Sequence, residues 1–595
     1  MFWLLLAVCV FTLMPFLDYE YNTKGEPRES IVSYSMLTTH NWVLPRNNGG
    51  EMAYKPPFFH WCVAAVSALN GKVTETTSRI PSAAALIAVV MITFVFYARR
   101  KSPTVAMFAA LVCLLSMELH RAGGNCRVDM LLTALSVGAI CLFYRWHEQG
   151  CRRPPFWAIV LMSLATLTKG PVGFLIPCAA TGAFLLLKRT NFFVAFGKLF
   201  VCGLLALIPY AIWFYAAWQQ GGQEFIDLMY EENIGRMTNT MAYQSCVEPW
   251  WFNLLTLTYG FIPFTLLLVF GLFSMDSSWK KLLPFTLHPS FGKLRTSHRF
   301  TTWITSLDDT DLFSLATATV IIVFYTIPDC KRSVYLMPMY PFVAYFMARY
   351  MLWLGEQGKR SVTAYTSFLA VVGILLLFAL AIVKVGIVPE SLFQGKHAPE
   401  SIAALHNLAA LSGIGEWLLV ALPTIVCVGW WWFLSRAEGW FQRWMSGVGH
   451  LSYSFLIALT IYVAVDGVYK PAVLGGKSVK PIAAELRTRC PASEGGMYEY
   501  IEKSVYSKGD PLHYFELNFF LGNTIGNFHK EQPDKGFLLI GAEDMQLRKA
   551  DFESRGYQFD EVYSTSRHLA GQPFRVYRFR RSAINPQPST LNHLP

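Results

Sequence analysis

The sequence predicts a mainly α-helical, polytopic membrane protein with about thirteen transmembrane helices, followed by a small α/β domain outside the membrane. Three observations support this prediction. Of the 595 residues, 53% are hydrophobic and only 15% are charged, whereas soluble domains typically contain about 25% charged residues. Apolar stretches of roughly 20 residues, long enough to cross a bilayer, recur along the first 470 residues. From about residue 471 the composition becomes a mixture of polar and apolar residues.

The candidate spans follow one another closely along this apolar part of the chain. We expect the first to be a membrane anchor, because it lacks the basic start and the small-residue cleavage site of a signal peptide. The thirteen ranges are 2–17, 79–98, 104–119, 128–144, 156–168, 171–187, 199–218, 251–273, 312–327, 333–354, 362–386, 414–434 and 452–469.

Basic residues between the spans predict the orientation. With the N-terminus in the cytoplasm, every cytoplasmic loop carries at least two Lys or Arg, in agreement with the positive-inside rule. An odd number of spans then places the C-terminal domain outside. Much of the net charge of +11 lies in these loops, so nucleic-acid binding is the weaker explanation for it. The loops are 98–102, 145–154, 188–198, 278–300, 355–361 and 435–444.

Residues 471–581 predict a separate extracytoplasmic α/β domain. Its segments alternate between helical and extended patterns, and Gly556 follows the last helical one. The tail, 582–595, contains two prolines and is predicted to be disordered. The expected elements are a helix at 479–489, strands at 513–522 and 536–541, a helix at 542–556 and a strand at 574–581.

Charged residues in the outer loops need an explanation other than anchoring. The first outer loop, 18–78, is too long for a connector, and a short amphipathic helix around Ile31 and Tyr34 is expected along the membrane surface. A charge costs roughly 2.5–3.5 kcal/mol at mid-bilayer, so charges kept at the boundary usually line a polar cavity. Several cations with a few carboxylates suit a lipid-linked phosphate, because Lys and Arg neutralise the phosphate and a carboxylate acts as a base.

Motifs in these loops resemble those of the GT-C membrane glycosyltransferases. They are “GEPRE” and “YKPP” in the first loop, then “RVDM”, “TKGP”, “EENIGRM” with “EPWW”, and “KRSVYLMPMYP”. Within this class the chain is most similar to the aminoarabinose–lipid A transferase and protein O-mannosyltransferase group, over roughly residues 1–350. The resemblance implies a catalytic transmembrane domain at 1–470 in the inner (plasma) membrane of a bacterium. It also implies transfer of a sugar from a polyprenyl phosphate to a lipid or protein acceptor on the outer face.

The resemblance further implies roles for individual residues. Lys55 of “YKPP” would bind the donor phosphate together with Arg236 and Tyr335. Asp129 of “RVDM” would face the reaction centre or the acceptor. The remaining candidates for the pocket or the acceptor site are Arg28, Lys169, Asn233, Lys331 and Arg332.

Two positions depart from the family's pattern. The first loop of relatives usually has an Asp-Glu pair whose Asp is implicated in catalysis, but here Gly25 stands at that position and only Glu26 remains. We therefore expect Glu26 to be the catalytic base, with Asp18 as an alternative, or no base if the acceptor is a phosphate. Tyr54 stands where some relatives have a glutamate that helps to hold a metal. The sequence thus assigns no cofactor and argues against a divalent-metal site.

A mechanism follows from these assignments. Lys55 and Arg236, brought together from separate loops, would stabilise the charge that develops on the leaving phosphate. Pro56 and Pro57 restrict the backbone after Lys55 and hold its ammonium group in place. A base would deprotonate the acceptor hydroxyl, which attacks the anomeric carbon from the opposite face, so the reaction is expected to invert the configuration.

Structural explanations and other functions compete with this interpretation. Lys55 alone could extend to the membrane interface, Arg236 could pair with Glu232 one helical turn earlier, and Asp129 could cap a helix. A secondary transporter would spread its charges across mid-membrane depth and usually shows internal repeats. A non-catalytic scaffold with an outer binding domain would not require “YKPP”, “RVDM” and “KRSVYLMP” together.

Overall fold

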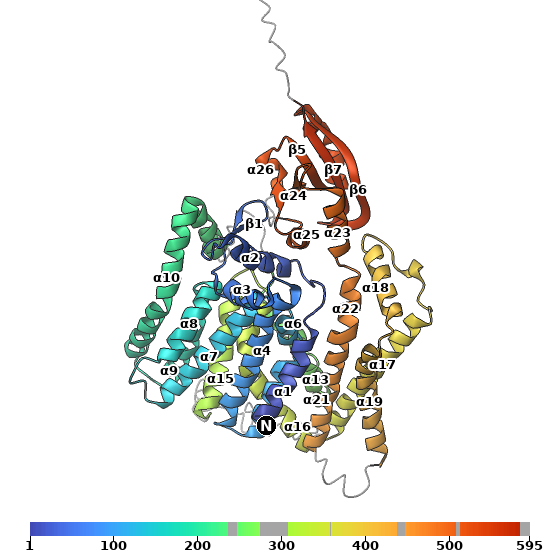
Figure 1. The fold of residues 1–595 in the computed structure, drawn as a ribbon. Coiled ribbons are helices and arrows are strands. Elements are labelled where there is room, and N and C mark those ends of the chain that lie inside the picture. Colours follow the sequence, from blue (N-terminus) through green and yellow to red (C-terminus); the bar gives the residue numbers. More distant parts are fainter. Residues whose placement is uncertain are drawn as a thin grey trace, which may run out of the picture.

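A helical bundle and a C-terminal sheet make up the protein, and they meet at one end of the bundle (Figure 1). The computed structural model describes residues 1–235, 238, 247–273, 307–357, 359–436, 447–506 and 512–582. The predicted disordered tail, 582–595, lies outside these described residues except for Ser582.

The first half of the bundle consists of one apolar helix, the short elements of the first outer loop, and then a series of mostly longer helices. Its helices and strands are α1 (Phe2–Leu13), α2 (Gly25–Thr39), β1 (Arg46–Asn47), β2 (Glu51–Met52), α3 (Phe58–Asn70), α4 (Glu75–Ala98), α5 (Pro103–Leu115), α6 (Met117–Gly123), α7 (Val128–Glu148), α8 (Phe156–Lys169), α9 (Val172–Leu187) and α10 (Phe192–Tyr230).

The second half continues with shorter and longer helices up to the C-terminal domain. They are the π-turn η2 (Glu231–Gly235), α12 (Phe252–Gly260), α13 (Phe264–Phe273), α15 (Asp309–Thr326), the 3₁₀ segment η4 (Ser333–Met339), α16 (Tyr340–Gln357), α17 (Lys359–Lys384), α18 (Ala398–Ala410), α19 (Ile414–Arg436), α21 (Gly447–Ala464), η6 (Val465–Tyr469) and α22 (Lys470–Gly475).

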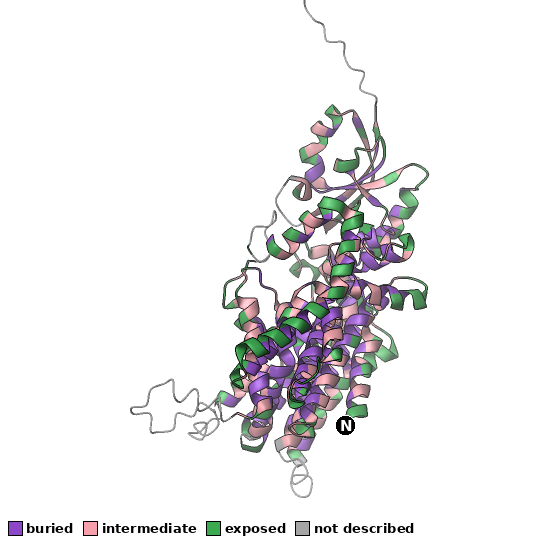
Figure 2. Ribbon diagram, turned by 90° about the vertical axis from the view of Figure 1, so that its left-hand side faces the viewer, coloured by how far each residue is buried: buried purple, intermediate pink, exposed green. Residues whose placement is uncertain are grey.

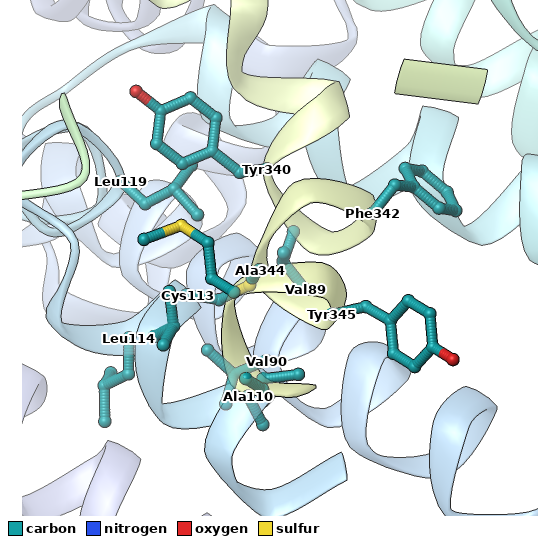
Figure 3. Close-up of a cluster of buried hydrophobic side chains, with 14 of the residues drawn as sticks. Val89, Val90, Ala110, Cys113, Leu114, Leu119, Tyr340, Phe342, Ala344 and Tyr345 are labelled. Carbon is teal, nitrogen blue, oxygen red and sulfur yellow. The ribbon is translucent and has the colours of Figure 1, made fainter. Parts of the chain in front are cut away.

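Small and aromatic side chains let the central helices pack closely. Figure 3 shows Val89 and Val90 of α4, Cys113 of α5 and Ala344 of α16 meeting in one buried cluster. All four side chains are almost completely removed from solvent. Close packing of this kind fixes the relative positions of helices that carry site residues at their ends.

Long apolar helices identify an integral membrane protein. Within the described residues, seven helices are long and apolar enough to span a bilayer, or nine if two bent pairs each count as one span. Each of the thirteen predicted ranges falls on a helix or on two consecutive helices. The helices in these ranges that are not among the seven or nine candidate spans are shorter or less apolar. Side chains such as Phe193 and Ile212 on α10 are exposed, as Figure 2 shows for the outer faces of the bundle. A lipid environment accounts for such a large exposed apolar surface.

The C-terminal domain is built on a five-stranded mixed sheet with the order β4-β3-β5-β7-β6. The neighbours β4, β3 and β5 are parallel, whereas β7 is antiparallel to both β5 and β6. Its elements are α23 (Lys480–Arg489), β3 (Gly496–Tyr500), α24 (Glu502–Tyr506), α25 (Phe515–Phe520), β4 (Ile525–Asn527), α26 (Phe528–Glu531), β5 (Lys535–Gly541), α27 (Ala542–Ser554), β6 (Tyr557–Leu569) and β7 (Gln572–Arg581).

The strand predicted at 513–522 is wrong, because this segment contains helix α25. Tyr514, Leu517 and Leu521 are spaced by three and four residues and point together into the core of the domain. Phe519 instead packs on the first outer loop, against Tyr21. In a helix, this segment buries one set of side chains in the domain core and another against the first outer loop. The sequence pattern alone did not reveal that the segment has two packing partners. The helices predicted at 479–489 and 542–556 and the strands predicted at 536–541 and 574–581 are confirmed as α23, α27, β5 and β7.

Helix α2 does not have the single apolar face that the sequence suggested. Consecutive residues from Ser30 to Ser33 are all buried, because α3 and α25 both pack against this helix. Polar contacts fix the C-terminal domain in this position: Asn523 Nδ2 donates to Ser35 Oγ at 3.0 Å, and Asn518 Nδ2 donates to Asn48 Oδ1 at 2.9 Å. The domain therefore helps to position the helix that carries the site residues described next.

Candidate active site

Lys55 forms an ion pair with the carboxylate of Glu29, and this pair is the first half of the candidate site. Lys55 follows the β1–β2 hairpin, and the two prolines after it lead directly into α3. Glu29 Oε1 contacts the Lys55 ammonium and lies 3.6 Å from the Arg28 guanidinium. Its second oxygen, Oε2, accepts a hydrogen bond from His60 Nε2 at 3.0 Å. Three elements thus converge on one buried carboxylate.

The surroundings of this ion pair lower the pKa of both groups. Burial lowers the pKa of Lys55 to about 8, although the Glu29 carboxylate opposes this effect. Burial by itself would raise the pKa of Glu29, but Lys55, His60 and Arg28 together hold it well below its usual value. At neutral pH the lysine is therefore positively charged and the glutamate negatively charged.

A second ion pair lies between Lys169 and Asp129. Asp129 is in the first turn of α7, where the helix dipole favours a negative charge, and Lys169 is the last residue of α8, where it favours a positive one. The Lys169 ammonium lies 4.2 Å from the centre of the Tyr335 ring, which stacks on Tyr325 at 5.4 Å. A cation–π contact of this kind orients the ammonium group.

The two ion pairs are close enough to interact. The Asp129 carboxylate raises the pKa of Lys55, opposing the effect of burial on the ammonium group. Arg28, Glu29, Lys55, Asp129 and Lys169 are hereafter called the charged cluster. Its cations and carboxylates alternate where α2, α3, α7 and α8 meet. Both lysines interact with the Asp129 carboxylate, so the cluster holds their two positive charges near one another.

Asn233, which the sequence named as a candidate pocket residue, lies beside the residue that follows Lys169. Its Oδ1 is only 3.5 Å from the point that a Cβ atom on Gly170 would occupy, directly after Lys169. Its amide Nδ2 donates to the Met229 carbonyl at 2.9 Å.

The other residues predicted for the pocket or the donor phosphate are Lys331, Arg332 and Arg236. The Lys331 ammonium donates to the Glu248 carbonyl at 3.0 Å and holds two loops together. Arg332 precedes η4, and its carbonyl accepts from the Tyr335 amide at 3.0 Å. Arg236, predicted as a second donor-phosphate ligand, lies outside the described residues.

Glu26 is placed where a catalytic base could not work, which argues against the role predicted for it. The residue is fully buried, and its Oε1 accepts from Arg79 Nε at 2.9 Å and from the Cys126 amide at 3.0 Å. Its Oε2 accepts from the amides of Asn22 and Thr23. Four donors occupy the carboxylate, so no lone pair faces the charged cluster.

The alternative base, Asp18, is also outside the cluster. It is exposed, and its Oδ1 accepts a hydrogen bond from Thr76 Oγ1 at 3.3 Å. Among the described residues, no three His, Cys, Asp or Glu side chains are grouped so that they could hold a metal ion.

Comparison with known proteins relates this geometry to a family. The family model described as dolichyl-phosphate-mannose-protein mannosyltransferase matches residues 54–215, a range that includes Lys55, Asp129 and Lys169. An undecaprenyl phosphate-alpha-4-amino-4-deoxy-L-arabinose arabinosyl transferase of Edwardsiella ictaluri is 25% identical over 343 residues, which cover 56% of this chain and 56% of the relative. An uncharacterized protein of Aquifex aeolicus is 26% identical, over 58% of this chain and 63% of its own length.

A solved structure shows the fold. The crystal structure of ArnT from Cupriavidus metallidurans bound to undecaprenyl phosphate superimposes with a TM-score of 0.66, at 17% identity, and covers 97% of both chains. The chain has the ArnT fold and resembles the GT-C glycosyltransferases. The resemblance is to the aminoarabinose transferase and protein mannosyltransferase group, as the sequence motifs predicted. The chain spans less than two thirds of the length of the first curated relatives it matches, with 63% and 56% covered.

The sequence interpretation missed two residues of this candidate site. Glu29 lies four residues after Gly25, so the two positions share one face of α2, one turn apart. His60 follows “KPP” at the start of α3. Both residues belong to motifs that the sequence had already singled out, but only the packing of α2 on α3 shows that they meet.

Proposed function

We propose that this protein is a glycosyltransferase that moves a sugar from a polyprenyl-phosphate donor to a lipid, of the lipid A type, or to a protein acceptor. The observation that carries the proposal is the pair of lysines, Lys55 and Lys169, held by carboxylates where four helices meet. Two fixed cations at the end of an apolar bundle suit a phosphate whose polyprenyl tail lies in the membrane. The names of the relatives, and the undecaprenyl phosphate bound to ArnT, support a donor of this class.

The chemistry follows from the charges. When the glycosidic bond to the phosphate breaks, negative charge develops on the leaving phosphate, and preorganised ammonium groups lower the energy of that state. Asp129 is the carboxylate of the charged cluster that pairs with Lys169, and we assign to it the deprotonation of the acceptor. Attack from the face opposite the phosphate inverts the anomeric configuration. The transferred group is a hexose or a pentose.

The orientation in the membrane is part of the proposal. We assign thirteen crossings, a cytoplasmic N-terminus, an extracytoplasmic C-terminal domain and an inner-membrane location in a bacterium. Support comes from the thirteen helical ranges and from the contacts between the C-terminal domain and the first outer loop. The domain, this loop and the charged cluster then all lie on the outer side, where a lipid or protein acceptor would approach.

The proposal assigns the phosphate to side-chain cations and requires no divalent metal. Lys55 pairs with Glu29 and Lys169 pairs with Asp129, and Arg28 adds a third positive charge next to Glu29. Tyr54, whose ring centre is 5.9 Å from the Lys55 ammonium, stands where some relatives have a glutamate.

Transfer by the purified protein tests the function. Mass spectrometry of envelope glycolipids and glycoproteins, with and without the chain, identifies the sugar and the acceptor. Transfer of that sugar is then measured in lipid nanodiscs. Lys55→Ala is expected to lower transfer by at least about 100-fold, because a charged phosphate contact is lost.

Lys188→Ala is the matched control. Lys188 also forms an ion pair, with Asp309, but it is separated from Lys169 by the whole length of α9. The Lys188→Ala variant should transfer the sugar within about twofold of the wild-type rate, because surface ion pairs contribute little. Full transfer by Lys55→Ala would rule out the proposed phosphate site, and unchanged glycolipids and glycoproteins would rule out the proposed activity.

A further inference from the structure

Glu29 is a buried carboxylate whose two oxygens have different partners. Only 8% of its side chain is exposed, and one of its oxygens contacts Lys55, whose side chain is 20% exposed. The other oxygen is held by His60, which is 1% exposed. One side of the glutamate therefore faces the site, and the other is anchored in the protein interior.

The hydrogen bond from His60 fixes this orientation. His60 Nδ1 is buried and has no hydrogen-bond partner among the described residues, so the ring proton is best placed on Nε2, where it is donated to Glu29. Ser33 Oγ donates to the His60 carbonyl at 3.1 Å and ties the start of α3 to α2. The carboxylate can thus receive the lysine in only one direction.

Lys55 depends on a neighbouring carboxylate to keep its charge. The groups that act on it are Glu29 and Arg28 from α2 and Asp129 from α7. Burial and the Arg28 guanidinium disfavour the ammonium form, whereas the two carboxylates favour it. Asp129 is itself paired with Lys169, so Glu29 is the main group that keeps Lys55 protonated.

We propose that Glu29 is a positioning residue of the donor-phosphate site: oriented by His60, it keeps Lys55 protonated and directs its ammonium group toward the phosphate. This inference rests on the proposed function and names a residue for it. A deprotonated lysine would present a neutral amine, which cannot neutralise a phosphate. Glu29 does not take the base role predicted for Glu26 in the same helix, because it acts through Lys55 and not on the acceptor.

Binding of undecaprenyl phosphate as a function of pH tests the inference. The dissociation constant is measured in nanodiscs between pH 6 and 10 for the wild type and for Glu29→Gln. In the wild type, binding should weaken as the pH rises through about 8, where the Lys55 ammonium loses its proton. In Glu29→Gln this transition should move down by about one pH unit or more, because the stabilising negative charge is gone. The phosphate of undecaprenyl phosphate is the same in both measurements, so its own titration does not contribute to the difference between the wild type and Glu29→Gln.

A second substitution separates charge from structure. In the Glu29→Gln background, Lys55→Arg should restore binding above pH 8, because a guanidinium group stays protonated without help. Glu29→Asp keeps the negative charge and should keep the transition within about half a pH unit of the wild type. It also serves as the variant to measure if Glu29→Gln does not fold.

Glu26→Gln is the matched control on the same helix. It removes a buried negative charge that contacts Arg79 and not Lys55, so it should lower thermal stability without moving the transition. The inference is overturned if Glu29→Gln weakens binding equally at every pH, or if Lys55→Arg fails to restore binding. Undiminished binding by Lys55→Ala would instead refute the proposed phosphate site itself, so the two failures are distinguishable.

Discussion

Glu26 and Glu29 lie three residues apart on α2, and both are buried, but their surroundings differ. Glu26 is surrounded by donors that belong to the scaffold: a fully buried arginine and three backbone amides. Glu29 shares its charge with Lys55, which is partly exposed to the site. The comparison teaches that the identity and exposure of a carboxylate's partners decide between a structural and a functional role, since residue type and burial are the same.

The buried pair of Glu26 and Arg79 gives the largest expected effect. Arg79 also donates to the carbonyls of Leu17 and Tyr19, so the pair fixes the start of the first outer loop. Glu26→Ala leaves the guanidinium group without its counter-charge, which typically costs about 3–5 kcal/mol of unfolding free energy. Thermal unfolding in detergent measures this loss. A melting temperature equal to that of the wild type would remove the structural side of the comparison.

Asp129→Asn examines the carboxylate assigned to the acceptor. A lost general base typically lowers the rate by about 100-fold or more, whereas donor binding depends mainly on the lysines. The turnover number should therefore fall much more than the affinity for undecaprenyl phosphate. Steady-state kinetics with the identified acceptor checks this. A rate within twofold of the wild type would show that Asp129 does not act as the base.

The pH dependence of stability gives a smaller effect with a defined sign. The pKa of Lys55 is lowered to about 8 in the folded protein, so between about pH 8 and 10 the unfolded chain binds a proton that the folded chain does not. This difference raises the unfolding free energy with pH, by at most about 1.4 kcal/mol per pH unit. Donor binding falls over the same range.

Lys55→Met provides the measurement. The wild type should gain stability relative to Lys55→Met as the pH rises from about 8 to 10. Subtracting the unfolding free energy of Lys55→Met from that of the wild type at each pH removes the contribution of the titrating groups that the two proteins share. Glu26→Gln should preserve this gain, whereas Glu29→Gln should start it at a lower pH. A constant difference between the wild type and Lys55→Met would mean that the lysine does not titrate in this range.

Removal of divalent metal ions is expected to have the smallest effect. If the lysines supply the positive charge that the phosphate needs, a chelator such as EDTA should leave transfer within about twofold of the untreated protein. Transfer is measured before and after dialysis against the chelator, with re-addition of Mg²⁺ or Mn²⁺ as the control. A loss that the metal restores would show that the cluster requires a bound cation.

The sequence anticipated much of the candidate site, but not how its residues are paired. Lys55, Asp129 and Lys169 come from motifs that the sequence singled out, and the structure brings them together with Tyr335 and Arg28. The pairing of Glu29 with Lys55 joins residues 26 positions apart, and no local pattern specifies such a contact. Lys331, which belonged to the same prediction, donates to the Glu248 carbonyl, a contact that no local pattern specifies either.

The sequence by itself determined the class of the protein and the places of its apolar helices. A span of apolar residues is stable in a bilayer because of its own composition, and its backbone hydrogen bonds close within the helix. Only the tertiary structure decided which glutamate of α2 serves the site and that α25 is a helix. Both outcomes depend on which surfaces pack together, and a side chain's partners in a packed interior come from distant parts of the chain.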